Sequence, residues 1–261
     1  MKRMILTGIL ALAAGAAGLL AQTPAGPKTP QPKSKAELEA LQAMFGAQGN
    51  PDATIKAADD LLTKFADTDF KETALYLEAD AYQQKKDPTK AQIFAEKALE
   101  VNPKSYQASI MLAEIVVQGT RENDLDKEEK LSKADKYAKD AIDFVKDVPK
   151  PNPQVPDAQW EEFKKGIAAR GHNTMGLANL TRKKYDSAAA EFKLAAEADP
   201  QPAYAVRQAS ALQAGGKNDE AIAICDKLLA DTNLHPMIKQ VAQQVRAAAV
   251  KAGGKAPGGG E

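Results

Sequence analysis

The feature that most constrains the fold is an internal repeat of small and apolar residues. One set of positions recurs 97 residues later with the same spacing: Ala79, Ala91, Ala95, Ala98 and Pro103 correspond to Gly176, Ala188, Phe192, Ala195 and Pro200. Shifts of 33 or 34 residues find weaker copies, so that five copies begin near Leu38, Glu72, Tyr106, Ala169 and Pro202. A repeat of this length indicates stacked supersecondary units that each pack on their neighbours.

The residues within each copy follow the periodicity of an α-helix. Ala91, Phe94, Ala95 and Ala98 lie at intervals of three and four residues and form one helix face. Asn50 and Asp87 each precede a proline, which predicts the start of a helix. The Asn or Asp side chain can accept a free amide of the first turn, and proline suits the first helical position because an amide hydrogen there would have no partner. The sequence therefore predicts an all-α protein.

The pattern resembles the tetratricopeptide repeat (TPR). It places a small residue on a first helix, a large one such as Tyr82 a turn later, small residues on a second helix, and a closing proline at Pro103 or Pro200. Small residues allow two helices to approach closely where they cross. The resemblance covers about residues 38–235 and implies an α-solenoid of about five helical hairpins, with residues 236–252 as a C-terminal capping helix. A generic bundle of alanine-rich hairpins is the alternative.

The ends of the chain differ in composition from its middle. Lys2 and Arg3 precede an uncharged run, so we expect residues 1–21 to be a cleavable signal peptide, with a retained membrane anchor as the alternative. Residues 22–33 contain four prolines and are predicted to be a disordered linker. The repeat domain is expected over residues 34–252, because Ser34 and Glu37 form a capping box at its start. Residues 253–261 are predicted to be a Gly-rich disordered tail. Export predicts a periplasmic or secreted protein.

Two segments interrupt the repeats. Residues 119–133 are densely charged, which predicts a solvated insertion. Residues 148–156 contain four prolines, which predicts an extended crossing. Trp160, Phe163 and Ile167 follow as an apolar stripe, so we expect one unusually long helix with weak points at Gly166 and Gly171.

The sequence offers little that indicates catalysis. His172 and His235 are far apart and neither has a metal ligand at suitable spacing, so we expect no metal, no cofactor and no enzymatic activity. Cys225 lies on an apolar helix face and is predicted to be a buried structural thiol. Lys and Arg number 35 and so do Asp and Glu, so nucleic acid is an unlikely partner.

The face made by the first helices is the candidate binding surface. TPR-like arrays line a groove with first-helix residues, and a mixture of amides, an aromatic ring and carboxylates suits a bound peptide or helix. The resemblance therefore implies a non-enzymatic scaffold for a peptide or protein partner; a structural subunit of a cell-envelope assembly and an envelope hydrolase are the alternatives. The expected groove residues are Tyr76, Asp80, Gln83, Gln107, Ile110, Glu114, Asn173, Leu177 and Gln213.

Overall fold

The computed structural model describes residues 30–255, which form eleven α-helices and no strand. These residues fall into two compact units, which are described separately. Unit 1 comprises residues 30–103 together with 149–156, and unit 2 comprises residues 104–148 and 157–255. The predicted signal peptide, most of the predicted linker and the last six residues lie outside the described range.

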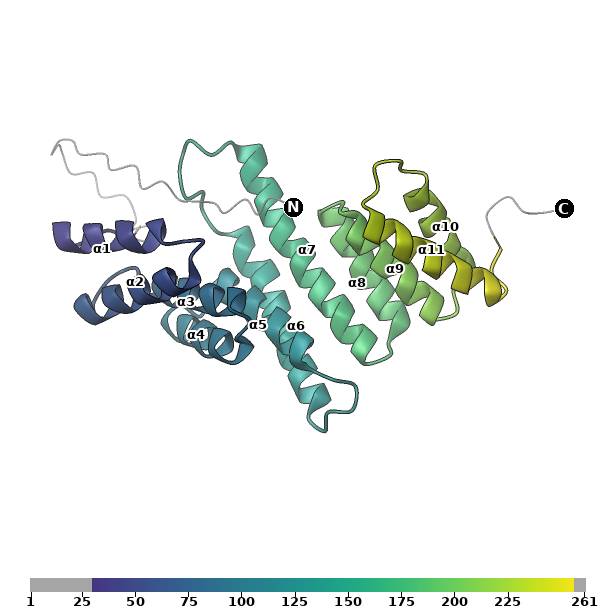
Figure 1. The fold of residues 1–261 in the computed structure, drawn as a ribbon, viewed down its shortest axis with the longest axis horizontal. Helices are drawn as coiled ribbons and strands as arrows, with labels where there is room; N and C mark the ends of the chain where they lie inside the picture. Colours follow the sequence, from purple (N-terminus) through teal and green to yellow (C-terminus); the bar gives the residue numbers. More distant parts are fainter. Residues whose placement is uncertain (1–29, 256–261) are drawn as a thin grey trace. The chain divides into compact units, whose positions relative to one another are not determined.

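Unit 1 contains two helical hairpins: α1 (Lys35–Gly46) with α2 (Pro51–Lys64), and α3 (Lys71–Gln84) with α4 (Pro88–Val101) (Figure 1). The predicted caps are confirmed, because Asn50 accepts the amide of Ala53 at 3.2 Å and Asp87 accepts that of Lys90 at 3.0 Å. The small residues of α4 lie in the core: Ala91, Ala95 and Ala98 are fully buried. The apolar face that the sequence predicts for this helix is therefore the face that packs.

The start of α1 differs in one detail from the predicted capping box. The Ser34 hydroxyl accepts the Glu37 amide at 3.1 Å, as expected. The Glu37 carboxylate, however, accepts the amide of Lys33 at 2.6 Å rather than that of Ser34, and its other oxygen accepts the Thr68 hydroxyl at 2.6 Å. Lys33, assigned from sequence to the linker, is thus bound to the first helix.

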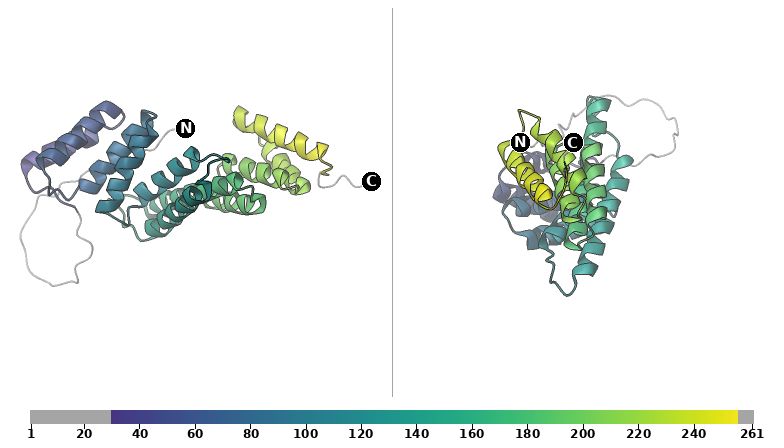
Figure 2. Two further views of the ribbon diagram at one scale, coloured as in Figure 1. Left: turned by 90° about the horizontal axis from the view of Figure 1, so that it is seen from below. Right: turned by 90° about the vertical axis from the view of Figure 1, so that its right-hand side faces the viewer.

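Unit 2 contains the remaining seven helices, which run back and forth as antiparallel neighbours (Figures 1 and 2). The first and second helices of its hairpins alternate along the chain. They are α5 (Tyr106–Gly119), α6 (Lys127–Lys146), α7 (Asp157–Thr181), α8 (Tyr185–Ala198), α9 (Pro202–Ala214) and α10 (Asn218–Leu229), followed by α11 (Pro236–Lys251). The last helix packs against α9 and α10, as the predicted capping helix should. The predicted all-helical hairpin architecture is confirmed.

The turns between paired helices reproduce the repeat found in the sequence. Lys86 and Lys183, which are 97 residues apart, both have a φ of 60° in the turn after a first helix. Gly216, 33 residues further on, has a φ of 81° in the corresponding turn. This left-handed conformation suits glycine and is strained for lysine.

The charged insertion is less solvated than predicted. Helix α6 begins at Lys127, so only residues 120–126 form a loop. Leu131 is fully buried and packs with Val117 and Ala178. The side chain of Arg182 is 6% exposed and contacts Glu128 and Asp135, each at 2.8 Å. Burial of Leu131 therefore packs residues 127–133 against the neighbouring helices.

The proline-rich segment is not helical, and residues 152–155 within it form a turn. The side-chain oxygen of Asn152 accepts a hydrogen bond from the Gln154 amide at 2.8 Å. The backbone carbonyl of Asn152 accepts one from the Val155 amide at 3.0 Å. The long helix predicted after it is confirmed as the 25 residues of α7. Near its start, Trp160 is 5% exposed, stacks on Phe163 and donates its indole hydrogen to the Val148 carbonyl at 3.2 Å.

Candidate functional site

Three of the predicted groove residues lie in unit 1. Tyr76, Asp80 and Gln83 all belong to α3, and each side chain is half-buried. Asp80 accepts a hydrogen bond from Gln84, one helical turn later, at 2.6 Å. These residues offer an aromatic ring and polar groups on a single helix.

The other six predicted residues lie on first helices of unit 2. Gln107 and Glu114 on α5, Asn173 and Leu177 on α7, and Gln213 on α9 are half-buried. Ile110 is only 2% exposed, which places it in the core and corrects its assignment to the binding surface. Leu177 packs against two core clusters, so it also supports the fold. A branched aliphatic side chain gains more from burial than from exposure to water, which explains both departures.

Two arginines connect the first helices of unit 2 to one another. Arg170 on α7 donates two hydrogen bonds, both 2.8 Å long, to the Glu114 carboxylate on α5. Arg207 on α9 donates to the side-chain carbonyl of Asn173 on α7. The face shared by α5, α7 and α9 is therefore crossed by two side-chain bridges, one ionic and one between a charge and a neutral amide.

The charge on this face is not balanced. We call Glu114, Arg170, Asn173, Tyr204 and Arg207 the arginine cluster. Glu114 neutralises Arg170, whereas Arg207 makes no ion pair with any residue between 30 and 255 and retains its positive charge. Burial raises the pKa of the Tyr204 hydroxyl, as does Asp199, while Arg207 and Arg170 oppose the rise. The cluster thus offers a guanidinium and an amide to a bound group, while its Tyr204 is buried with Ala169 and Ala195.

The sequence prediction included Glu114 and Asn173 but missed Arg170 and Arg207. Gln107 was chosen at the second position of the third copy, and Arg170 occupies the same position of the fourth. The position of Arg170 in the repeat is therefore the signal in the sequence that indicates it as a groove residue. Arg207 lies one position after the residue equivalent to Tyr76 and Asn173, and its approach to Asn173 depends on how α7 and α9 pack.

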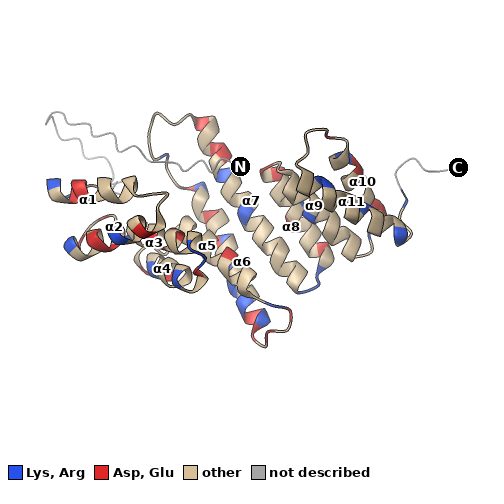
Figure 3. Ribbon diagram, viewed as in Figure 1, with Lys and Arg blue, Asp and Glu red and all other residues tan. Residues whose placement is uncertain are grey.

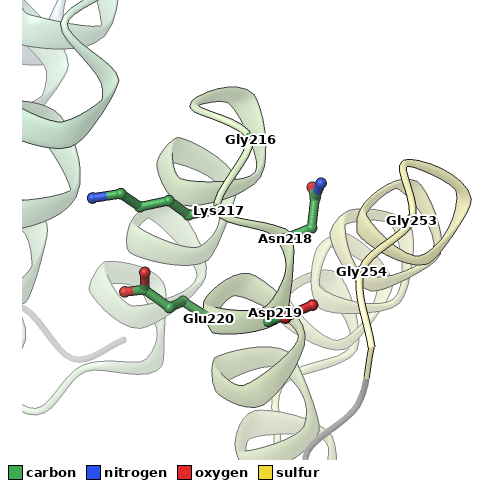
Figure 4. Close-up of a pocket in the computed structure, with 7 residues that line it drawn as sticks. All are labelled: Gly216, Lys217, Asn218, Asp219, Glu220, Gly253 and Gly254. Carbon is green, nitrogen blue, oxygen red and sulfur yellow. The ribbon is translucent and has the colours of Figure 1, made fainter.

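A hollow in unit 2 is lined by glycines and polar residues. This hollow of about 340 Å³ lies between the start of α10 and the end of α11, lined by Gly216, residues 217–220, Gly253 and Gly254. Its Lys217 and Glu220 side chains point away from Gly253 and Gly254 (Figure 4). Between residues 30 and 255, no three His, Cys, Asp or Glu side chains gather as a metal site requires. The polar side chains that line this hollow do not point toward a common centre (Figure 4).

On the helices that the structure describes, positive and negative residues are interspersed (Figure 3). Within the part of the chain that the structure describes, no helix combines the length and apolar character needed to cross a membrane.

The remaining residues considered from sequence have structural contacts. His172 contacts Glu191 through its Nδ1 atom at 2.8 Å, and the His235 ring accepts the amide of Met237 at 3.3 Å at the start of α11. Cys225 is fully buried with Val206, Ala209 and Ala242, in agreement with the prediction. Burial raises the pKa of its thiol to about 11.

Comparison with known proteins supports the repeat assignment. Residues 72–105 match the family described as tetratricopeptide repeat. A thermophilic TPR protein of Thermus thermophilus, TTC0263, has a similar structure with a TM-score of 0.51 and 20% identity, over 82% of this chain and 99% of that one. The MamA protein is similar with a TM-score of 0.53 and 14% identity, over 83% and 95% of the two chains. No curated protein matches the sequence significantly. At these identities the structural likeness concerns the fold.

Proposed function

We propose that this protein is a non-enzymatic scaffold that binds a peptide or protein partner on its first-helix face. It carries a tetratricopeptide repeat and has the fold of TPR proteins. The observation that carries this proposal is the arginine cluster of unit 2. It brings polar side chains from three successive first helices onto one face. Such a face recognises an extended peptide or a helix through side-chain hydrogen bonds without any moving part.

Arg207 is the residue of the cluster that a partner would engage most strongly. Its charge is not neutralised by a carboxylate, and its hydrogen-bond partner is the neutral amide of Asn173. Planar guanidinium groups favour bidentate contacts with carboxylates. We therefore propose that the partner presents an acidic group to Arg207, with Asn173 orienting the adjacent backbone.

A photo-crosslinking experiment tests this face directly. A crosslinking amino acid at Gln213 on α9 should capture a partner in the native cell, whereas the same residue at Lys193 on α8, a second helix, should not. Arg207→Gln should then weaken capture at position 213 by about tenfold, since hydrogen bonds to charged groups contribute about 1.5–3 kcal/mol. Lys193→Gln removes a positive charge from a second helix and is the matched control.

The results distinguish the proposed face from the alternatives. Capture that is unaffected by Arg207→Gln but abolished by changes in residues 120–126 would place the site on the loop before α6. Equal capture from positions 193 and 213 would favour a subunit packed side-on within an assembly.

We also propose that the scaffold acts in the periplasm or cell envelope. The support is the sequence alone: Lys2 and Arg3 followed by the uncharged residues 4–20. N-terminal sequencing of the native protein should begin at Gln22 or within a few residues of it. An intact Met1 on a membrane-bound product would contradict cleavage, and an intact Met1 on a cytoplasmic product would contradict export.

A further inference from the structure

Unit 1 contains a carboxyl group at a position that other copies of the repeat fill with apolar side chains. Glu78 is the seventh residue of the second copy and is fully buried. The same position holds Met44, Leu112 and Met175 in the first, third and fourth copies, all buried, and the neutral Gln208 in the fifth. A carboxyl group here replaces core packing with a group that water solvates far better.

The surroundings of Glu78 do not stabilise a negative charge. Neither oxygen of its carboxylate has a hydrogen-bond partner among residues 30–255. Helices α2 and α4 pack against α3, and the charged groups that act on Glu78 are Asp59 of α2 and Lys97 of α4. The carboxylate of Asp59 disfavours a negative charge on Glu78, whereas Lys97 favours it. A protonated Glu78 avoids the repulsion that two ionised carboxylates would exert on each other.

We infer that Glu78 is a proton-dependent switch built into unit 1: with its proton it stays buried between α2 and α4, and without the proton it loosens α3 from these helices. An unpaired charge in a packed interior is costly, and the least costly escape is for the carboxylate to reach water by displacing its helix. Because α3 also carries Tyr76, Asp80 and Gln83, this movement alters the surface that those residues form. The inference does not depend on the proposed partner.

The direction of the pH effect follows from the environment. Burial raises the pKa of Glu78 from 4.5 to about 8, with Asp59 adding to the rise and Lys97 opposing it. The folded state therefore holds a proton that the unfolded state releases, and stability falls as pH rises from about 4.5 to about 8. Above that range the loss is complete, and below it the carboxyl is neutral in both states.

Hydrogen exchange measured on the full chain between pH 6 and pH 9 tests the switch, after correction for the intrinsic exchange rate. Protection of backbone amides in α3 should fall by about tenfold or more in the wild type and remain constant in Glu78→Gln, which keeps the shape without the acid. Peptides from α8 provide an internal control. Glu78→Met, which introduces the residue type found at positions 44 and 175, should also remove the pH dependence, and it keeps the test decisive if Glu78→Gln does not fold.

Two neighbouring variants should shift the midpoint in opposite directions. Asp59→Asn removes a negative charge, so the transition should move to lower pH, while Lys97→Gln removes a positive charge and should move it to higher pH. The switch is overturned if α3 loses protection equally in the wild type and in both Glu78 variants, or if neither neighbour shifts the midpoint.

Discussion

Gly176 on α7 lies directly against the aromatic ring of Phe192 on α8: a methyl group at Gly176 would stand 2.6 Å from the Cε1 atom of Phe192. The equivalent pair in the second copy is Ala79 and Ala95, both fully buried. The same pair of positions thus holds a glycine and a large ring in the fourth copy and two buried alanines in the second. The crossing of α7 and α8 depends on the absence of a side chain at residue 176.

This contact predicts that Gly176→Ala destabilises the protein. The added methyl group must displace a fully buried ring, which we expect to reduce the free energy of unfolding by about 1–3 kcal/mol. Gly166→Ala is the matched control on the same helix, because nothing lies within 4 Å of a methyl group there. It should increase stability by about 0.5–1 kcal/mol, since alanine favours the helix. Urea denaturation of both variants checks the pair, and a neutral Gly176→Ala would show that Phe192 can move aside.

The strained turn at Lys86 predicts a stabilising substitution. Its φ of 60° is left-handed and costs a residue with a β carbon about 1 kcal/mol. Lys86→Gly should therefore raise the free energy of unfolding by about 0.5–1 kcal/mol. Lys86→Ala removes the same charge but keeps the β carbon, so it should leave stability unchanged. Thermal or urea denaturation would contradict this account if the alanine variant gained as much as the glycine variant.

The Arg182 guanidinium should be important for stability. It is held between Glu128 and Asp135, and burial raises the pKa of Asp135 while Arg182 opposes that rise. Arg182→Met leaves Asp135 without its partner, so we expect a loss of about 2 kcal/mol or more at pH 7. The loss should shrink as the pH falls and Asp135 becomes protonated, because a neutral carboxyl needs no cation beside it.

Glu128→Gln provides the control for Arg182. The Glu128 side chain is 64% exposed, so its removal should change stability by less than about 1 kcal/mol. Equal effects from the two variants in urea denaturation would show that the contact with Asp135 adds nothing.

Cys225 should be protected from modification in the folded chain. The residue is fully buried and the pKa of its thiol is raised to about 11, so both access and thiolate content are low at pH 8. A bulky disulfide reagent should label it slowly under native conditions and at once in denaturant. Cys225→Ala should cost about 1 kcal/mol or more because it leaves a cavity beside Ala209 and Ala242. Rapid native labelling would show that this part of unit 2 opens readily.

The local features of the fold were predictable because they depend on neighbours in the sequence. Asn50 and Asp87 cap helices through amides three residues away, and the spacing of Ala91, Ala95 and Ala98 places them on one helix face. The shared turn conformation of Lys86 and Lys183 follows the 97-residue repeat. Such interactions act within a few residues and leave a periodic signal.

The partners of polar side chains were decided only by the tertiary structure. Glu37 was expected to accept the amide of Ser34, yet it binds Lys33 and also Thr68, 31 residues away. Ile110 was expected on a surface and lies in the core, and Arg207 was overlooked because its contact with Asn173 spans 34 residues. Periodicity fixes which face of a helix is apolar, but the orientation of its neighbours fixes which polar groups meet. The sequence therefore determined the helices, their caps and the repeat, while only the packing of the helices determined the arginine cluster and the buried carboxyl of Glu78.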